Sequence, residues 1–243
     1  MWNGRTIAVV LPTFRERNSI AAVVKGFEAL GIVDEIVVVN NNAEAGTSAE
    51  VATTSAREVL ETTQGYGAAI QRGLREVDAD LVCVCEPDAT FNPDDLLKLL
   101  PYSVDCDAVF GSRTVSTFIW SGANMNWFLR WGNWAVAKLI EILYNTPYLS
   151  DVGCTYRMIR REALAKLLPA FQVNSNFFGP EMMVRGYRMK LKSVQIPVNY
   201  KERTGPSSVT GNLGKSIILG GQMILLIVAM RFRLERWLLP LLR

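Results

Sequence analysis

Two acidic side chains end an apolar run in the stretch VCVCEPDATFNPDDL, which occupies residues 82–96. Glu86 and Asp88 stand two positions apart, so on an extended segment both side chains point to the same side. Two carboxylates in that position repel each other unless a cation lies between them or one of them acts through a water molecule. Oxygen ligands of this kind suit Mg²⁺ or Mn²⁺, which commonly bridge one or two carboxylates and a diphosphate. The pair indicates a divalent metal site, with a solvated acidic loop as the alternative.

The next two acids, Asp94 and Asp95, have a simpler explanation. They follow Asn92 and Pro93, which are typical of the cap and the first position of a helix. Acidic side chains in a first helical turn interact favourably with the helix dipole. We therefore assign this second acidic pair to a helix start.

The composition excludes several classes of chemistry. Histidine is absent from the 243 residues, which removes His-ligated zinc and nucleophile–histidine pairs, so a general base would have to be a carboxylate or a less usual group. A net charge of +3, with no basic run interleaved with aromatic residues, gives no indication of nucleic-acid binding. The cysteines match no CxxC metal pair, and we expect buried free thiols at Cys83, Cys85, Cys106 and Cys154.

The first half of the chain alternates β-branched runs with helical periods. Strands are expected at residues 6–11, 35–40, 81–85 and 108–111, and helices at residues 19–30, after a cap at Asn18 or Ser19, and at residues 66–77. This alternation predicts an α/β fold with a Rossmann-like, mostly parallel sheet flanked by helices. Ligands of such sheets bind beyond the carboxyl ends of the strands, which is where Glu86 and Asp88 fall.

The second half of the chain is rich in tryptophan. Four of the six tryptophans are Trp120, Trp127, Trp131 and Trp134. They indicate either an amphipathic segment at a bilayer surface, where indole rings are favoured, or core packing, since the last three follow helical spacing.

An uncharged stretch at residues 216–230 lies near the C-terminus and is shorter than the about 20 residues that span a bilayer. Arg231, Arg233, Arg236 and Trp237 follow it, and we expect this segment to associate with a membrane surface. A buried helix and a contact for a membrane partner are the alternatives. The apolar run at the N-terminus breaks at Pro12 and is typical of a first strand, not of a signal peptide. We expect a cytoplasmic protein, peripheral at the cytoplasmic face of the membrane.

Further motifs follow the predicted strands in order. They are PTFRE at residues 12–16, NNNAEAGT at 40–47, QGYGAA at 64–69, EPD at 86–88, GSR at 111–113, DVGCTYR at 151–157, Glu181, and YKERTGPSS at 200–208. This series resembles family-2 glycosyltransferases with the GT-A fold, specifically the dolichyl-phosphate mannosyltransferase or polyprenyl-phosphate glycosyltransferase type. The resemblance covers about residues 6–208.

The resemblance implies a nucleotide-sugar site and a metal. The donor, a UDP- or GDP-sugar, would contact Pro12, Thr13, Glu16, Asn40, Asn41, Gly65 and Glu86. Asp88 would be the principal ligand of Mg²⁺ or Mn²⁺, with Glu86 as the second acid, nearer the sugar or the ribose, and Thr90 as a further polar ligand. The family's usual DDGS loop reads NNNA here, and Asn offers one acceptor and one donor, so the base stays open.

The resemblance also implies the reacting groups. The candidate catalytic residues are Asp88, Arg113, Asp151 and Glu181, and the acceptor phosphate would be held by Arg113, Arg130, Arg203 and Ser207. Guanidinium groups bind phosphate oxygens bidentately, although a surface or salt-bridge role is the alternative for each arginine. Asp151 and Arg157 would either support the acceptor loop or act directly. A phosphate acceptor is already an anionic nucleophile, whereas a hydroxyl acceptor would need Glu181 or Asp151 as a base.

We therefore expect a GT-A catalytic domain over residues 1–210, followed by an apolar and basic helical segment over residues 211–243. The implied activity is inverting, metal-dependent transfer of a sugar from a nucleotide diphosphate to a polyprenyl phosphate. The alternatives are a soluble or saccharide acceptor and a catalytically silent binding or scaffold subunit. A homo-oligomer or a membrane partner stays open. A dinucleotide-dependent dehydrogenase is excluded because no glycine-rich turn follows the first strand.

Overall fold

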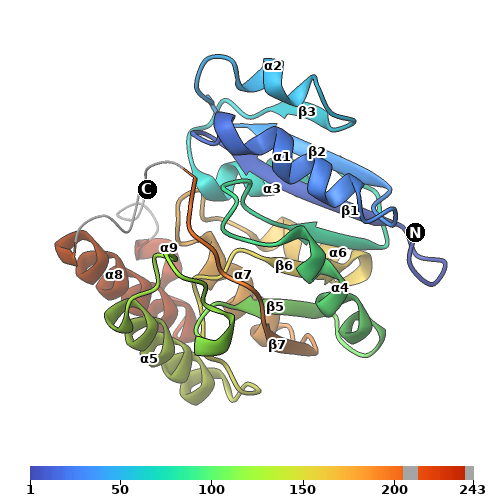
Figure 1. Ribbon diagram of the computed structural model, residues 1–243. Coiled ribbons are helices and arrows are strands. Elements are labelled where there is room, and N and C mark those ends of the chain that lie inside the picture. The colour runs from blue at the N-terminus through green and yellow to red at the C-terminus, as the bar shows by residue number, and fades with distance from the viewer. Residues whose placement is uncertain (205–212, 239–243) are drawn as a thin grey trace.

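A seven-stranded sheet forms the centre of the molecule in the computed structural model, which describes residues 1–204 and 213–238. The strand order is β3-β2-β1-β4-β6-β5-β7 (Figure 1). The strands are β1 (Ile7–Thr13), β2 (Glu35–Asn40), β3 (Arg57–Leu60), β4 (Leu81–Val84), β5 (Ala108–Ser112), β6 (Arg157–Arg160) and β7 (Ser193–Pro197). Neighbouring strands are parallel except where β6 pairs with β4 and β5. The predicted mostly parallel α/β layer is confirmed.

Helices cover both faces of this sheet. They are α1 (Arg17–Glu28), α2 (Thr47–Val51), α3 (Tyr66–Glu76), α4 (Leu96–Leu99), α5 (Trp127–Tyr144), α6 (Arg161–Leu167), α7 (Phe178–Arg188), α8 (Leu213–Arg231) and α9 (Glu235–Leu238). Successive side chains of a strand point to opposite faces. Accordingly, Val9 of β1 packs in the core that includes Ile20 and Phe27 of α1, whereas Val10 packs in the core with Leu74 of α3.

The predicted helix starts differ in detail from the observed ones. Helix α1 begins at Arg17 with Glu16 as its cap residue, so neither Asn18 nor Ser19 caps it. Ser19 is buried instead, and its hydroxyl donates to the Pro87 carbonyl at 2.6 Å, which ties α1 to the loop after β4. Pro93 does open a helical turn, as expected, but that turn is a short 3-10 segment, and no side chain caps it.

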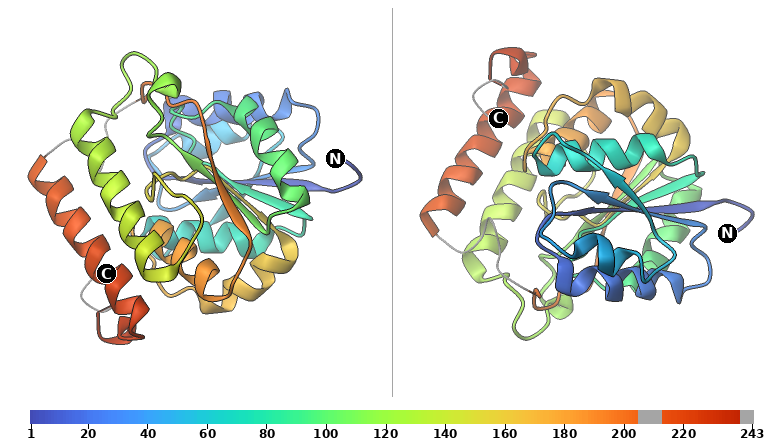
Figure 2. Two further views of the ribbon diagram at one scale, coloured as in Figure 1. Left: turned by 90° about the horizontal axis from the view of Figure 1, so that it is seen from below. Right: turned by 90° about the horizontal axis from the view of Figure 1, so that it is seen from above.

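Helices α5 and α8 form a layer of their own. Both views of Figure 2 show α5 (light green) and α8 (red) side by side, at the end of the sheet away from the N-terminus. Because β1 starts near the N-terminus, this layer lies beyond the carboxyl ends of the parallel strands. The Tyr144 hydroxyl donates to the Ile227 carbonyl at 2.7 Å, and Arg231 Nε donates to the Leu143 carbonyl at 2.8 Å, so the two helices are joined by polar contacts as well as by packing.

The tryptophans of α5 do not pack in the core. Trp127, Trp131 and Trp134 are 72%, 55% and 39% exposed, which contradicts the core-packing alternative. The uncharged stretch falls within α8, where Leu226 and Ile227 are buried in the same core as α3 and α7. In the part of the chain that the structure describes, no helix is both long and apolar enough to cross a membrane. The expected domain boundary at residue 210 lies outside the described residues.

Candidate active site

Nine of the predicted site residues line one cavity of about 780 Å³. They are Pro12, Thr13, Glu16, Asn41, Gly65, Glu86, Asp88, Arg113 and Arg203. The cavity lies between the carboxyl ends of the strands and the layer of α5 and α8, because both groups of elements contribute to its wall. The location predicted from the ends of the strands is therefore the location of a large cavity.

The two acids after β4 both face this cavity. Asp88 is only 2% exposed, and its Oδ1 accepts hydrogen bonds from the backbone N–H and the hydroxyl of Thr90, at 3.0 and 2.6 Å. The Glu86 carboxylate makes no hydrogen bond or ion pair within the described residues. Burial, together with the nearby charge of Asp88, raises the pKa of Glu86 to about 8. Two carboxylates are thus forced together where solvent screens them poorly.

A strap formed by residues 198–204 brings an arginine to these acids. The strap crosses the molecule from β7 toward the strand ends (Figure 1), and its Thr204 N–H donates to the Asp88 carbonyl at 3.0 Å. Arg203 then forms two ion pairs, from Nη1 to Asp88 Oδ2 at 3.0 Å and from Nη2 to Glu16 Oε1 at 2.8 Å. The Nε of Arg203 is buried and has no hydrogen-bond partner. One guanidinium therefore joins the loops after β1 and β4.

Glu16 also shapes the loop after β1. Its Oε2 accepts the backbone N–H groups of Phe14 and Arg15, each at 2.8 Å, and the hydroxyl of Thr13 at 3.3 Å. These contacts hold the PTFRE motif in a tight turn, with Pro12 and Thr13 on the cavity wall. A carboxylate with this many donors is a positioning group for the loop.

The oxygen ligands of Glu86 and Asp88 fit a divalent metal whose remaining ligands come from the substrate and from water. The Glu86 carboxylate has no hydrogen-bond or ion-pair partner among the described residues. Asp88 Oδ2 also faces the cavity, where it pairs with the Arg203 guanidinium. Among the described residues, no group of three or more His, Cys, Asp or Glu side chains is arranged to hold an ion. Mg²⁺ usually keeps several waters and binds through one or two carboxylates plus substrate phosphates. Two protein carboxylates and a diphosphate would meet that requirement.

Arg113 is fixed by Asp151. Its Nε and Nη2 donate to the two oxygens of the Asp151 carboxylate at 2.9 and 3.0 Å, and its backbone N–H donates to the same carboxylate at 2.9 Å. Burial alone would raise the pKa of Asp151, but the Arg113 guanidinium and the backbone donors lower it below its usual value. Asp151 is fully buried and does not line the cavity, whereas Arg113 does. The aspartate therefore positions the arginine.

The asparagine run organises the loop before α3. Asn41 donates to the carbonyls of Glu61 and Thr63, each at 2.8 Å, and accepts the Gly65 N–H at 2.8 Å. Gly65 has a φ of +148°, and a Cβ there would lie 2.2 Å from the Asn174 carbonyl oxygen, so only glycine fits. Asn40 lies outside the cavity wall and donates to Glu58 at 2.8 Å. Of the two asparagines predicted to bind the nucleotide, only Asn41 lines the cavity.

Two other predicted residues are not in the cavity wall, and a third lies outside the described residues. Glu181 is completely buried, pairs with Arg185 at 2.7 Å, and accepts the backbone N–H groups of Gln172 and Val173. Arg130 lies on α5 but not in the cavity wall, and it makes no ion pair within the described residues. Ser207 lies outside the described residues. The structure thus places Glu181 in a buried ion pair outside the cavity wall.

The sequence reasoning missed most of the apolar wall. Helices α5 and α8 contribute Phe128, Leu129, Val136, Leu219, Met223 and Ile224 to the cavity. Gly132 and Gly220 also face it, and a Cβ at either would meet nothing within 4 Å. The only signal in the sequence was small residues set among apolar ones in two helices, which does not distinguish a cavity wall from helix packing.

Comparison with known proteins identifies the family of the chain. The model of "Glycosyl transferase family 2" matches residues 8–168. The chain belongs to glycosyl transferase family 2. An uncharacterised glycosyltransferase of Mycobacterium tuberculosis is 30% identical over 221 residues, which cover 88% of this chain and 94% of that protein. The undecaprenyl-phosphate mannosyltransferase of Micrococcus luteus is 25% identical over 226 residues, 87% of this chain and 91% of that protein.

A solved structure shows the same fold. Glucosyl-3-phosphoglycerate synthase from Mycobacterium tuberculosis, in complex with Mn²⁺, UDP and glucosyl-3-phosphoglycerate, aligns with a TM-score of 0.70 at 18% identity, covering 94% of this chain and 80% of that one. The predicted GT-A fold and the predicted glycosyltransferase class are therefore confirmed. The polyprenyl-phosphate subtype stays a prediction.

The Arg203 contacts generate a first prediction. Arg203→Met removes the guanidinium shared by Asp88 and Glu16, and we expect glycosyl transfer to fall by about 10²–10³-fold, the effect typical of losing one preorganised charged donor. Mn²⁺ affinity in the absence of nucleotide should rise, because Asp88 loses its competing cation. Initial rates and a Mn²⁺ titration measure the two effects.

Arg203→Lys is the matched control, since it keeps the charge but not the bidentate fork, and it should fall between the wild type and Arg203→Met. A variant Arg203→Met that melts earlier yet transfers sugar at the wild-type rate would show that Arg203 only fastens the strap.

Proposed function

We propose that this glycosyltransferase moves a sugar from a UDP- or GDP-sugar to a phosphate carried on a polyprenyl chain. The observation that carries the proposal is the two-sided lining of the cavity. Its strand-end side presents Glu86, Asp88, Arg113 and Arg203, whereas its other side is the apolar wall of α5 and α8. Small ligands generally bury most of their surface in a site of matching polarity. A phosphate on an apolar chain matches both sides, while a small polar acceptor would leave the apolar wall without a counterpart.

The donor end of the reaction would use the two acids after β4. Glu86 and Asp88 would hold Mg²⁺ or Mn²⁺, and the bound metal would offset the negative charge that develops on the departing diphosphate. Arg203 reaches the same place from the strap, so its guanidinium can bind phosphate oxygens there. Solved structures of glucosyl-3-phosphoglycerate synthase contain Mn²⁺ or Mg²⁺ together with UDP, which supports this assignment.

The acceptor end would need no general base. A phosphate monoester is already an anionic nucleophile, and the cavity offers neither Glu181 nor Asp151, since both carboxylates are buried in ion pairs. Arg113, held by Asp151 and 15% exposed at its side chain, would orient the acceptor phosphate. The names of two relatives point the same way: undecaprenyl-phosphate mannosyltransferase of Micrococcus luteus and dolichyl-phosphate hexose transferase of Haloferax volcanii, which is 27% identical over 219 residues.

An acceptor competition tests this proposal. The purified protein with Mn²⁺ and a panel of UDP- and GDP-hexoses should transfer sugar to undecaprenyl phosphate in detergent micelles, and chelation of the metal should abolish the transfer. A soluble acceptor is the alternative, because the similar fold of glucosyl-3-phosphoglycerate synthase has been solved with phosphoglyceric acid. Transfer to phosphoglyceric acid or glycerol phosphate, with none to the lipid phosphate, would refute a polyprenyl acceptor.

A size series in α5 locates the acceptor chain. Gly132→Leu projects an isobutyl group into the open part of the cavity, and we expect the KM for the lipid phosphate to rise at least about tenfold. The fold should survive, because leucine is a better helix former than glycine by nearly 1 kcal/mol. Gly132→Ala is the matched control and should behave like the wild type. Equal loss of donor binding in Gly132→Leu would place the effect at the nucleotide and not at the acceptor.

The outer face of the same two helices would rest on a membrane surface. We define the indole face as Trp127, Trp131 and Trp134 of α5 with Ile218 and Leu225 of α8, all of them exposed and none of them in the cavity wall. Exposed apolar patches mark interaction sites, and indole rings favour the interface between headgroups and lipid tails. Arg231 and Arg233, both exposed at the end of α8, would attract anionic headgroups. A bilayer surface would also be the source of a polyprenyl phosphate.

Vesicle sedimentation tests the indole face. The wild type should sediment with vesicles that contain phosphatidylglycerol, and the double variant Trp127→Ala, Trp131→Ala should lose at least about tenfold in partition coefficient. Tyr102→Ala removes an exposed aromatic residue from the turn after α4, across the molecule from α5 (Figure 1), and should change nothing. A wild type that ignores vesicles but dimerises through these tryptophans would show that a second copy covers the face.

A further inference from the structure

Buried polar atoms without a hydrogen-bond partner occur at six places in residues 1–204 and 213–238, and two of them face the large cavity. One is Nε of Arg203. The other is Oγ1 of Thr155, in the loop just before β6. A buried hydroxyl without a partner costs free energy comparable to a lost hydrogen bond. Thr155 therefore has a hydroxyl group at the wall of a space that a substrate would enter, within reach of the Tyr66 phenol.

Sheet register explains how Thr155 reaches this space. Strand β6 is antiparallel to β4 and pairs Arg157 with Val84, so continuing that register beyond the strand ends sets Thr155 opposite Glu86. Directly opposed residues of an antiparallel pair point to the same face. Both residues line the cavity, as does Tyr66, the first residue of α3. Burial raises the pKa of Tyr66, and the charge of Glu86 raises it further.

The floor of this corner is held rigidly. Arg157 donates through Nε to the Cys154 carbonyl at 2.7 Å, through Nη1 to Gly179 at 2.6 Å, and through Nη2 to Val152 at 2.8 Å. These bonds fix the loop that carries Thr155 against the start of α7. Within residues 1–204 and 213–238 this guanidinium pairs with no carboxylate, and its nitrogens donate to backbone carbonyls. The corner therefore presents two hydroxyls and one carboxylate on a fixed backbone.

On the basis of the proposed function, we infer that Tyr66, Glu86 and Thr155 form the subsite that reads the hydroxyl groups of the donor sugar. Order along the sheet supports this placement. Residues of the loops after β2 and β1 lie on one side of Asp88 and Arg203, and Thr155 lies on the other side, next to β6. If the base lies at the first loops and the diphosphate at Asp88, the sugar reaches Thr155.

The chemistry of the corner suits the hydroxyl groups of a sugar. These groups can donate to the Glu86 carboxylate and exchange hydrogen bonds with the hydroxyls of Tyr66 and Thr155. The three side-chain nitrogens of Arg157 are already bound to backbone carbonyls, so this arginine leaves the corner to the two hydroxyls and the carboxylate.

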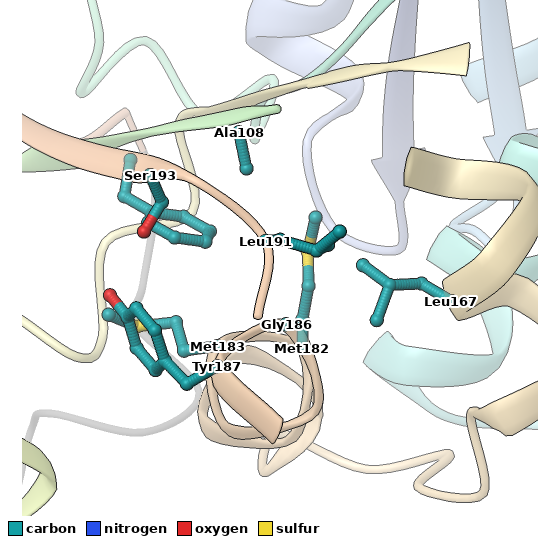
Figure 3. A pocket seen from close by; sticks show the side chains of 9 residues that line it. Ala108, Leu167, Met182, Met183, Gly186, Tyr187, Leu191 and Ser193 are labelled. Carbon is teal, nitrogen blue, oxygen red and sulfur yellow. The ribbon is translucent and has the colours of Figure 1, made fainter. Parts of the chain in front are cut away.

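Another pair of buried hydroxyls supplies a control. Tyr187 and Ser193 face a cavity of about 10 Å³ behind α7, where both hydroxyl groups turn toward the same space (Figure 3). That volume is close to the minimum for one water molecule, so no sugar enters it. Tyr187→Phe removes a phenol hydroxyl as Tyr66→Phe does, but Tyr187 lies outside the wall of the large cavity.

Binding of nucleotides and nucleotide sugars by calorimetry tests the inference. With Mn²⁺ present, wild-type affinities for UDP, GDP and a panel of their hexose derivatives identify the preferred donor. Thr155→Val and Tyr66→Phe should each weaken the preferred nucleotide sugar by about tenfold, the effect of one hydrogen bond, while the affinity for the free nucleoside diphosphate stays within twofold. Thr155→Ser should restore binding, and Tyr187→Phe should leave both affinities unchanged.

The possible outcomes distinguish a failure of the proposed function from a failure of the sugar subsite. If the wild type binds no nucleotide in the presence of metal, the proposed function fails, and the sugar subsite fails with it. If the wild type binds nucleotide sugars but Thr155→Val and Tyr66→Phe keep the wild-type ratio of sugar-nucleotide to nucleotide affinity, the function stands and the subsite is refuted.

Discussion

Three carboxylates lie at the carboxyl ends of β1 and β4, only two of them are paired with a guanidinium there, and this charge imbalance governs the site. Arg203 pairs with Glu16 and Asp88, while Glu86 has no cationic partner among the described residues and Arg113 is already committed to Asp151. Unpaired charges in a poorly solvated place are costly, so the arrangement favours a further cation. The same contacts tie the strap to the strand ends. Any cation that binds Asp88 must compete with Arg203, which would leave that guanidinium free for phosphate oxygens.

The helical layer makes the second half of the site. Helices α5 and α8 present an apolar wall to the cavity and an apolar face to the outside, and Leu226 and Ile227 anchor α8 in the main core. A helix with apolar residues on its exposed side is unusual for an isolated soluble domain. Both properties follow from one requirement if the acceptor is amphiphilic: its phosphate must meet Arg113 while its chain stays away from water.

The sequence was sufficient for the elements whose pattern is local. The runs at β1, β2, β4 and β5 are continuous and β-branched, so their positions and their burial followed directly. Strand β6 was missed because Arg157–Arg160 is four residues long, and its pairing partners lie more than 45 residues away in the chain. Asp95 was assigned to a helix start, yet it also accepts hydrogen bonds from the backbone and side chain of Asn199, a contact no local pattern reveals.

The site residues also fall into two groups, those whose place a local sequence pattern predicts and those whose role depends on distant contacts. Motifs at strand ends, such as Pro12, Glu86 and Asp88, lie where the fold predicts. Glu181 does not, because its carboxylate caps backbone N–H groups at Gln172 and Val173, and motif position alone cannot distinguish such a role from a catalytic one. Thr155 was not singled out, since its importance depends on the register of β6 against β4.

A calorimetric titration of the nucleoside diphosphate tests the central claim most directly, with and without Mn²⁺, in the wild type and in Asp88→Asn. If a metal held by Glu86 and Asp88 balances the charge of the diphosphate, the wild type binds UDP or GDP at least about tenfold more tightly with Mn²⁺, and Asp88→Asn keeps its fold but loses that enhancement. Binding that is equally tight without metal, or an enhancement that survives in Asp88→Asn, would contradict the account.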